Sequence, residues 1–219
     1  MNLKKTSNIP KLLFFFIFLL SPHLCAYCFE PNFSNSKISI IIDPGHGGND
    51  KGAKSVSNLE EKNFNLYLAF AIKNKLSSNF KVTLTRTSDY SMSDTQRVDI
   101  ANSGNHKLFL SIHSGSTFNQ TVNNNIFIGY NENTEDILTK KKPWYAIQKQ
   151  FELKNKKVLV INAYFNIASN LLMPFVLVET GNLNSASQSI IMKSPDYIND
   201  IADSISKGIT DFFGKNPHN

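Results

Sequence analysis

The sequence predicts a single-domain α/β fold, built on a twisted, mostly parallel or mixed sheet with helices on both faces. Short runs of β-branched and other apolar residues alternate with segments in which apolar residues recur every three to four positions. Strands and helices alternate in this way along an α/β chain. The chain has 219 residues, of which 41% are hydrophobic, and this is enough for one core. It contains no internal repeat, and we expect no second domain.

Each expected strand is a short apolar run. The first reads KISIIID and is followed by a Pro-Gly pair, and the last, FVLVE, carries a carboxylate at its end. Apolar and polar side chains alternate between residues 80 and 86, which is typical of a strand with one covered face. The predicted strands are Lys37–Asp43, Phe80–Arg86, Lys107–His113, Asn124–Tyr130, Lys156–Ile161 and Phe175–Glu179.

The expected helices are marked by periodicity and by capping residues. Ser93 with Gln96 forms a capping-box pattern, and Ser194 with Pro195 suits the cap and first turn of a long C-terminal helix. A weaker helical segment at 135–154 is broken at Pro143. The apolar positions that predict buried faces are Phe64, Leu68, Ile72 and Leu76 in the first helix, and Ile198, Ile201, Ala202, Ile205, Ile209 and Phe212 in the last.

The first 26 residues are predicted to be a secretory signal peptide. Lys4, Lys5 and Lys11 precede the apolar run Leu12–Leu20, which is too short for a stable membrane anchor and is followed by small residues near Ala26. We therefore divide the chain into a signal at 1–26, a polar linker at 27–36 and a catalytic domain at 37–214. The expected location is the periplasm, with secretion or the cell surface as the alternative.

Charge and cysteine content narrow the class of function. Loss of the signal removes three of the 23 basic residues and none of the 17 acids, so the formal charge falls from +6 to +3. The main argument for nucleic-acid binding is then lost. No window of about 18 apolar residues occurs, so we expect no membrane span after signal removal. Cys25 and Cys28 both lie at the processing site, which leaves no pair for an internal disulfide. We expect a monomer.

Three side chains suited to metal or acid–base chemistry stand where predicted strands end. His46 follows the first strand, His113 closes a middle strand, and Glu179 closes a late one. Ligands bind at the carboxyl ends of the strands in open α/β sheets. Two imidazoles and a carboxylate with one open position are a common arrangement for catalytic zinc. Taken alone, each histidine also fits a structural role, in a strand-to-helix turn for His46 and as a buried hydrogen-bonding residue for His113.

Five motifs give the chain a family resemblance. They read IIDPGHGGNDKGA, EEKNFNL, VTLTRTSD with QRVDIAN, LFLSIHSG and PFVLVETGNL, and extend from about Lys37 to Phe213. In this order they resemble the zinc-dependent N-acetylmuramoyl-L-alanine amidases of the bacterial cell wall. The resemblance implies a single α/β domain that acts on peptidoglycan. It also implies the reaction, hydrolysis of the amide between the lactyl group of N-acetylmuramic acid and L-alanine.

By motif position, the resemblance implies that His46, Glu61 and His113 bind one Zn²⁺ and that Glu179 is the catalytic carboxylate. An unactivated amide needs a metal that activates water near neutral pH and polarises the carbonyl. It also needs a nearby group that moves the proton. Composition does not choose between Glu60 and Glu61, since either acid suits the first turn of a helix. The family pattern, an acid directly before a lysine, selects Glu61.

The remaining candidate residues are the two arginines and the positions at which the chain departs from the family pattern. Arg86 and Arg97 are the only arginines, against 21 lysines. We expect both to be structural, with a planar fork that bonds carboxylates or carbonyls; direct substrate contact is the alternative. Ser114 and Gly115 replace the usual alanine and asparagine after the second histidine, and Ser169 stands where some members have an arginine. These departures concern substrate contacts and control by a partner, and they remove no ligand.

Three other functions are compatible with parts of the sequence. A serine peptidase that acts on wall peptides is suggested by Ser-x-x-Lys patterns at Ser34, Ser78 and Ser204, although chance alone gives about two such matches. A zinc exopeptidase would share the metal chemistry, and a non-catalytic wall-binding module would keep the fold. The sequence identifies no activator protein. The interval Ser114–Met173 leaves little room for a covering helix, so we expect the isolated domain to be active.

Overall fold

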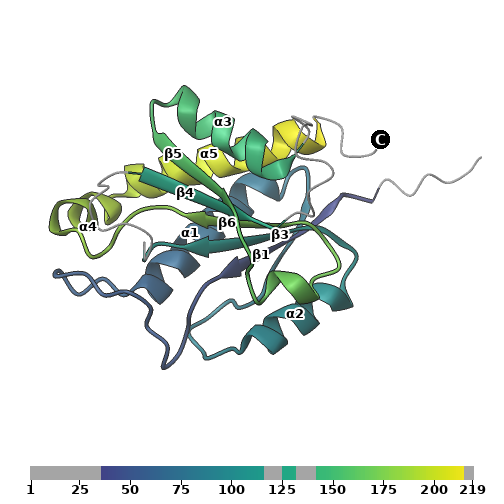
Figure 1. Cartoon of the computed structure of the whole chain (residues 1–219), viewed down its shortest axis with the longest axis horizontal. Coiled ribbons are helices and arrows are strands. Elements are labelled where there is room, and N and C mark those ends of the chain that lie inside the picture. Colours follow the sequence, from purple (N-terminus) through teal and green to yellow (C-terminus); the bar gives the residue numbers. More distant parts are fainter. Residues whose placement is uncertain (1–35, 116–124, 132–141, 215–219) are drawn as a thin grey trace, which may run out of the picture. The chain divides into compact units, whose positions relative to one another are not determined.

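The computed structural model describes residues 36–115, 125–131 and 142–214, and six strands in this part of the chain form one mixed sheet. The order of the strands is β2–β1–β3–β6–β4–β5 (Figure 1). The strands are β1 Ser39–Pro44, β2 Lys81–Leu84, β3 His106–His113, β4 Asn125–Tyr130, β5 Lys157–Asn162 and β6 Phe175–Glu179. The helices are α1 Glu61–Leu76, α2 Asp94–Ser103, α3 Pro143–Leu153, the 3₁₀ helix η2 Ala168–Asn170, α4 Ala186–Met192 and α5 Pro195–Phe213.

The sheet is parallel through β2, β1, β3 and β6, whereas β4 runs antiparallel to β6 and parallel to β5. The predicted α/β class with a mixed sheet is therefore confirmed. Because β1, β3 and β6 are parallel neighbours, their carboxyl ends lie at one edge. The register places Ile112 beside Pro44 and His113 beside Glu179. The residues that follow β1 and those that end β3 and β6 are thereby close together.

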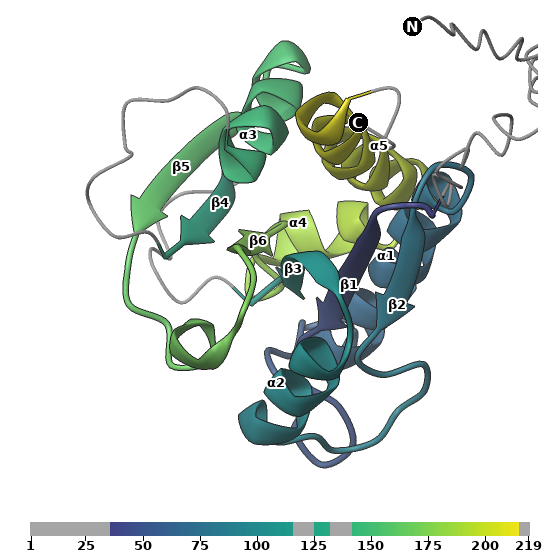
Figure 2. The same cartoon turned by 90° about the vertical axis from the view of Figure 1, so that its right-hand side faces the viewer.

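Helices cover both faces of the sheet (Figure 2). On one face, a large core cluster joins strand residues such as Ile40 and Leu110 to Leu68 of α1 and Ile205 of α5. A smaller cluster on the other face includes Ile41 and packs beneath α2 and η2. Strands that are buried on both faces read as continuous apolar runs. This explains why the central strands could be recognised in the sequence without strict alternation.

Most of the local predictions hold. The capping box at Ser93 and Gln96 is present at the start of α2, and Pro143 and Pro195 lie in the first turns of α3 and α5. The proline expected to break a helix thus begins one, while residues 135–141 of that prediction lie outside the described residues. Both α4 and η2 are absent from the sequence prediction, because segments of seven and three residues are too short to show a helical repeat.

Two smaller details of the prediction are corrected. The strand expected at residues 80–86 is shorter, since β2 ends at Leu84 and Arg86 lies beyond it. Phe212 was expected on the buried face of α5 but is partly exposed, and its neighbour Phe213 packs against the core instead. Neither change alters the layer order, because α5 still covers the sheet through its other apolar residues.

None of the helices in the described residues is both long and apolar enough to cross a bilayer. Residues 1–35, which include the predicted signal peptide and most of the linker, lie outside the described residues. The predicted division of the chain at residues 26 and 36 therefore stays a prediction.

The guanidinium of Arg86 ties the loop after β1 to the start of α1. This residue is 1% exposed. Its Nε donates to the carbonyl of Pro44 at 3.0 Å, and one terminal nitrogen donates to the carbonyls of Gly45 at 3.0 Å and Lys62 at 2.7 Å. The second terminal nitrogen donates to the carbonyl of Ser88 at 3.2 Å. A planar fork with five donors suits this set of carbonyls, which a lysine ammonium could not reach together.

Replacement of Arg86 by methionine is expected to destabilise the fold by roughly 2–4 kcal/mol, because buried carbonyls then lose their donors. Urea denaturation of the purified variant measures this loss. Lys149→Met, an exposed change on α3, is the matched control and should stay close to the parent. A loss for Arg86→Met no larger than for the control would contradict the structural role of Arg86.

Candidate metal centre

The loop after β1 turns sharply and presents the ring of His46. His46 itself has a positive φ of 63°, and Gly47 and Gly48 follow at 138° and 58°. Glycine adopts such conformations at no steric cost, whereas histidine rarely does. Paired backbone hydrogen bonds between Gly47 and Asp50 close the turn. The glycines after His46 therefore supply the bend that brings its ring to the carboxyl edge of the sheet.

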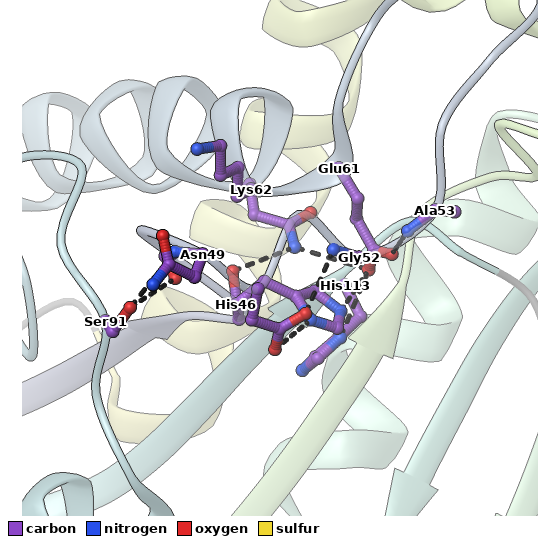
Figure 3. Close-up of polar contacts among 12 residues, drawn as sticks. His46, Asn49, Gly52, Ala53, Glu61, Lys62, Ser91 and His113 are labelled. Carbon is purple, nitrogen blue, oxygen red and sulfur yellow. Dashed lines mark hydrogen bonds and ion pairs between the residues drawn. The ribbon is translucent and has the colours of Figure 1, made fainter.

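Three side chains from separate elements converge at this edge (Figure 3). His46 comes from the loop after β1, Glu61 begins α1, and His113 ends β3. Nε2 of His46 and Nδ1 of His113 each lie 3.2 Å from Oε1 of Glu61. One ligand atom from each residue lies within 4.8 Å of the other two. Within the described ranges, this is the group of His, Cys, Asp and Glu side chains able to hold a metal ion.

The separations suit a zinc ion with three protein ligands. Bonds of about 2.0–2.1 Å at tetrahedral angles place neighbouring ligand atoms about 3.3–3.4 Å apart. The two nitrogen–oxygen distances of 3.2 Å are close to this value. Two imidazoles and one carboxylate are also a donor set of catalytic zinc sites, which keep one position open.

Asp50 fixes the orientation of the His46 ring. Its Oδ2 lies 2.8 Å from Nδ1 of His46, and its Oδ1 accepts from the Gly52 amide at 3.1 Å. Burial acts to lower the pKa of His46, but the carboxylates of Glu61 and Asp50 outweigh it and raise that pKa to about 9. A carboxylate on Nδ1 directs Nε2 toward the ligand group. Sequence reasoning missed Asp50; the signal available was an acid four residues after a histidine in a glycine-rich loop.

Glu61 is the anchor of the group. Its side chain is 3% exposed. Oε2 accepts from the Ala53 amide at 2.8 Å, and Oε1 accepts from the Ser114 amide at 2.9 Å. Burial acts to raise the pKa of Glu61, but the hydrogen bonds with His113 and His46 hold it well below its usual range. The carboxylate therefore stays ionised and draws cations to this point.

The neighbouring acid faces elsewhere. Glu60 is the last extended residue before α1, with φ −91° and ψ 136°. Its carboxylate lies 3.2 Å from the ammonium of Lys51 and 3.7 Å from that of Lys62. The geometry thus groups Glu61, and not Glu60, with the two histidines.

Glu179 lies beside the group on the next strand. It is paired in register with His113, so both side chains project from the same face of the sheet. The residue is 9% exposed, and its Oε2 accepts from the Gly115 amide at 3.0 Å. The consecutive amides of Ser114 and Gly115 hold the carboxylates of Glu61 and Glu179 respectively. One short segment therefore positions both acids of the site.

Three glycines leave room for these side chains. A Cβ on Gly45 would lie 2.3 Å from ring atoms of His113, and a Cβ on Gly52 or Gly115 would lie 2.6 Å from Oε2 of Glu61. Contacts this short do not occur between real Cβ atoms and their neighbours. The backbone can therefore pass beside the candidate ligands only where the residue has no side chain.

Arg97 and Asp43 form a buried ion pair beneath the His46 loop. Arg97 also donates to the carbonyls of Pro44 at 3.1 Å and His46 at 2.9 Å, and Asp43 accepts from Thr85 at 2.6 Å. Both arginines of the chain thus bond the backbone around the turn that carries His46. Arg97 in addition lines the cavity that opens at the two histidines.

The hydroxyl of Ser114 is part of the packing beside the candidate ligands. It is fully buried, with Oγ 3.0 Å from Oδ1 of Asn65 and 2.9 Å from Oγ1 of Thr180. The amide nitrogen of Asn65 lies 3.4 Å from both the Gly45 carbonyl and Oε1 of Glu61. This network links α1 to the ends of β3 and β6. No pattern in the sequence identified it, since the two contacts of the Ser114 hydroxyl join residues 49 and 66 positions apart.

Comparison with known proteins gives consistent relatives. The family model described as N-acetylmuramoyl-L-alanine amidase matches residues 40–211. The amidase CwlM of Bacillus licheniformis is 33% identical over 182 residues, which are 80% of this chain and 69% of that protein. The catalytic domain of the amidase CwlV from Bacillus (Paenibacillus) polymyxa var. colistinus is 29% identical with a TM-score of 0.71, over 80% of this chain and 98% of that one. The amidase AmiC2 of Nostoc punctiforme is 27% identical with a TM-score of 0.72, over 81% of this chain and 98% of that one.

Proposed function

The chain belongs to the N-acetylmuramoyl-L-alanine amidase family, and we propose that it hydrolyses the amide between N-acetylmuramic acid and L-alanine in peptidoglycan with the help of zinc. The names of CwlM and CwlV state the same activity. The observation that carries the proposal is the convergence of His46 and His113 on one oxygen of Glu61, with Glu179 beside His113 in register.

We assign one Zn²⁺ per chain to His46, Glu61 and His113. When bound, zinc supplies a Lewis acid that activates water near neutral pH and polarises the amide carbonyl. Glu61 contributes the buried negative charge that favours a cation at this point. Asp50 keeps Nε2 of His46 directed at the same place through its bond to Nδ1.

Glu179 is assigned the proton transfer. As the water oxygen bonds to the carbonyl carbon, the carboxylate accepts a proton from the water and delivers it to the leaving amine of L-alanine. The carbon–nitrogen bond then breaks, which leaves a lactyl carboxylate on the sugar and a peptide with a free amino terminus. The Gly115 amide fixes the direction of the Glu179 carboxylate through Oε2.

The structure argues against one of the three Ser-x-x-Lys matches that suggest a serine peptidase. Ser204 is 1% exposed inside α5 and donates to the carbonyl of Asp200. Ser34 lies outside the described residues. A zinc exopeptidase would use the same metal ligands, and a wall-binding module would bind without hydrolysis. Product analysis separates these alternatives from the amidase.

Mass spectrometry of peptidoglycan digested by the purified, zinc-loaded chain tests the proposed function. We expect peptides that begin with a free L-alanine, and sugars that carry a lactyl carboxylate. Shortened peptides still attached to sugar would indicate an exopeptidase, and undigested wall would indicate a binding module. We expect activity from the chain alone; hydrolysis that begins only after a partner protein is added would contradict this.

Removal of a ligand should remove the metal. We expect His46→Ala and Glu61→Ala to weaken zinc binding more than about 100-fold. Loss of a residue that only hydrogen-bonds a metal ligand already lowers metal affinity about 10–100-fold. Glu60→Ala is the matched control, because the carboxylate of Glu60 contacts lysines and not the two histidines. Zinc per chain is measured by elemental analysis after dialysis. Loss of zinc from the Glu60 variant and its retention in the Glu61 variant would reverse the assignment.

The variant Glu179→Gln separates binding from chemistry. It keeps size and polarity but removes the basic oxygen, so kcat should fall by about 10²–10⁴-fold while zinc content and folding stay normal. Glu152→Gln, an exposed change on α3, serves as the control. Near-normal turnover of the Glu179 variant would falsify the proton-transfer role. Joint loss of zinc and activity would make Glu179 a ligand instead.

We also propose that residues 1–26 direct export and that the enzyme acts on the wall from the periplasm or the outer surface. Amino-terminal sequencing of the exported protein should find a first residue close to Tyr27. An intact Met1 on protein that stays in the cytoplasm would contradict the export proposal.

A further inference from the structure

A furrow runs from the two histidines along α2. One cavity of about 300 Å³ opens at His46 and His113 and continues beneath α2. A second cavity of about 770 Å³ lies between α2 and the connection from β5 to β6. Asp94, Asn166 and Ile167 line both cavities, so the two adjoin. We call them together the α2 furrow.

The two walls of the α2 furrow, α2 and the connection from β5 to β6, are joined by hydrogen bonds. The side chain of Asn102, on α2, donates to the carbonyl of Asn170 at 2.8 Å and accepts from the amide of Leu172 at 3.0 Å. Figure 1 shows η2, which contains Asn170, beside α2 on the same side of the sheet. Beneath them, Ile167 packs on the smaller core cluster. The furrow is therefore formed before any ligand arrives, which lowers the entropic cost of binding.

Away from the metal group, the α2 furrow carries an excess of negative charge. Four aspartates line it against one arginine, and no lysine lines it in the described part of the chain. The arginine, Arg97, is already paired with Asp43. Asp50 bonds the His46 ring, and the other two aspartates, Asp94 and Asp99, belong to α2. A negative surface repels carboxylates and tolerates neutral groups. The peptide that leaves this reaction ends in a carboxylate, whereas N-acetylglucosamine, and N-acetylmuramic acid whose lactyl group is amidated, carry no charge on the sugar.

The polar groups of the α2 furrow match those of a sugar. Amide and hydroxyl side chains, which donate and accept hydrogen bonds without charge, come from Thr95, Asn166, Ser169 and Asn170. Tyr164 stands among them and is 74% exposed, so its ring offers an apolar face with a polar tip. The hydroxyl and acetamido groups of a sugar can form hydrogen bonds with these amide and hydroxyl side chains. The apolar face of the sugar ring can stack on Tyr164.

We propose that the α2 furrow binds the glycan arm of the substrate and that Tyr164 determines preference for an extended glycan. The proposal rests on the proposed function. Sugars beyond the N-acetylmuramic acid at the zinc site occupy the furrow from Asp94 to Tyr164. The peptide arm extends from the zinc site away from these aspartates. Tyr164 touches the sugar ring but none of the reacting atoms, so it acts on affinity and not on the chemical step.

The test compares two substrates with the same peptide, one on a single N-acetylmuramic acid and one on a glycan of at least four sugars. The zinc-loaded parent should have a lower KM for the longer glycan. Tyr164→Ala should raise KM for that substrate by about tenfold, in line with the loss of one aromatic contact. Its kcat, its zinc content and its KM for the single sugar should not change. Tyr67→Ala on α1, which removes a tyrosine of 72% exposure, is the matched control and should match the parent on both substrates.

Two results would overturn the glycan assignment. In one, Tyr164→Ala matches the Tyr67→Ala control on the long glycan. In the other, it raises KM equally for both substrates, which would indicate a general disturbance of the site. If the parent cleaves neither substrate, the proposed function fails and the furrow assignment falls with it. If the parent cleaves both substrates and Tyr164→Ala has the same KM values as the parent, the furrow assignment fails while the proposed function stands.

Discussion

The buried carboxylate of Glu61 is the constraint on which the rest of the site depends. A carboxylate that is 3% exposed is costly unless its oxygens are bonded. Here the oxygens accept from two backbone amides and face two imidazoles. To satisfy this one group, the loop after β1, the start of α1 and the end of β3 must meet at a single point. This convergence requires space, which the glycines at 45, 52 and 115 provide. It also requires that the turns be fixed, and the two arginines do this by bonding their carbonyls.

The parts of the site that follow from chain direction could be predicted from the sequence. Residues that end parallel neighbouring strands meet at one edge, and the structure places His46, His113 and Glu179 there. The α/β class and the central strands were also readable, because strands buried on both faces are continuous apolar runs. The choice of Glu61 over Glu60 came from the family resemblance alone. Local pattern cannot supply it, because the apolar repeat of α1 begins only at Phe64.

The missed features depend on contacts that no short pattern records. Asp50 reaches the His46 ring only because the turn between them takes positive φ angles. The buried hydroxyl of Ser114 bonds groups about 50 and 66 residues away. The α2 furrow is formed by two segments that are joined by bonds across about 70 residues. In each case the tertiary structure decides which groups meet, and the residue types alone are compatible with solvated loops.

The main chain after β3 shows why Ser114 and Gly115 must be considered together. Their neighbouring amides hold Glu61 and Glu179, so the separation between these two carboxylates is set by one peptide unit. A Cβ on residue 115 would lie 2.6 Å from Oε2 of Glu61. A side chain at this position would therefore press on the Glu61 carboxylate. Gly115 lets this segment pass close enough to bond both carboxylates, and the buried Ser114 hydroxyl fixes that path by bonding α1 and the residue after β6.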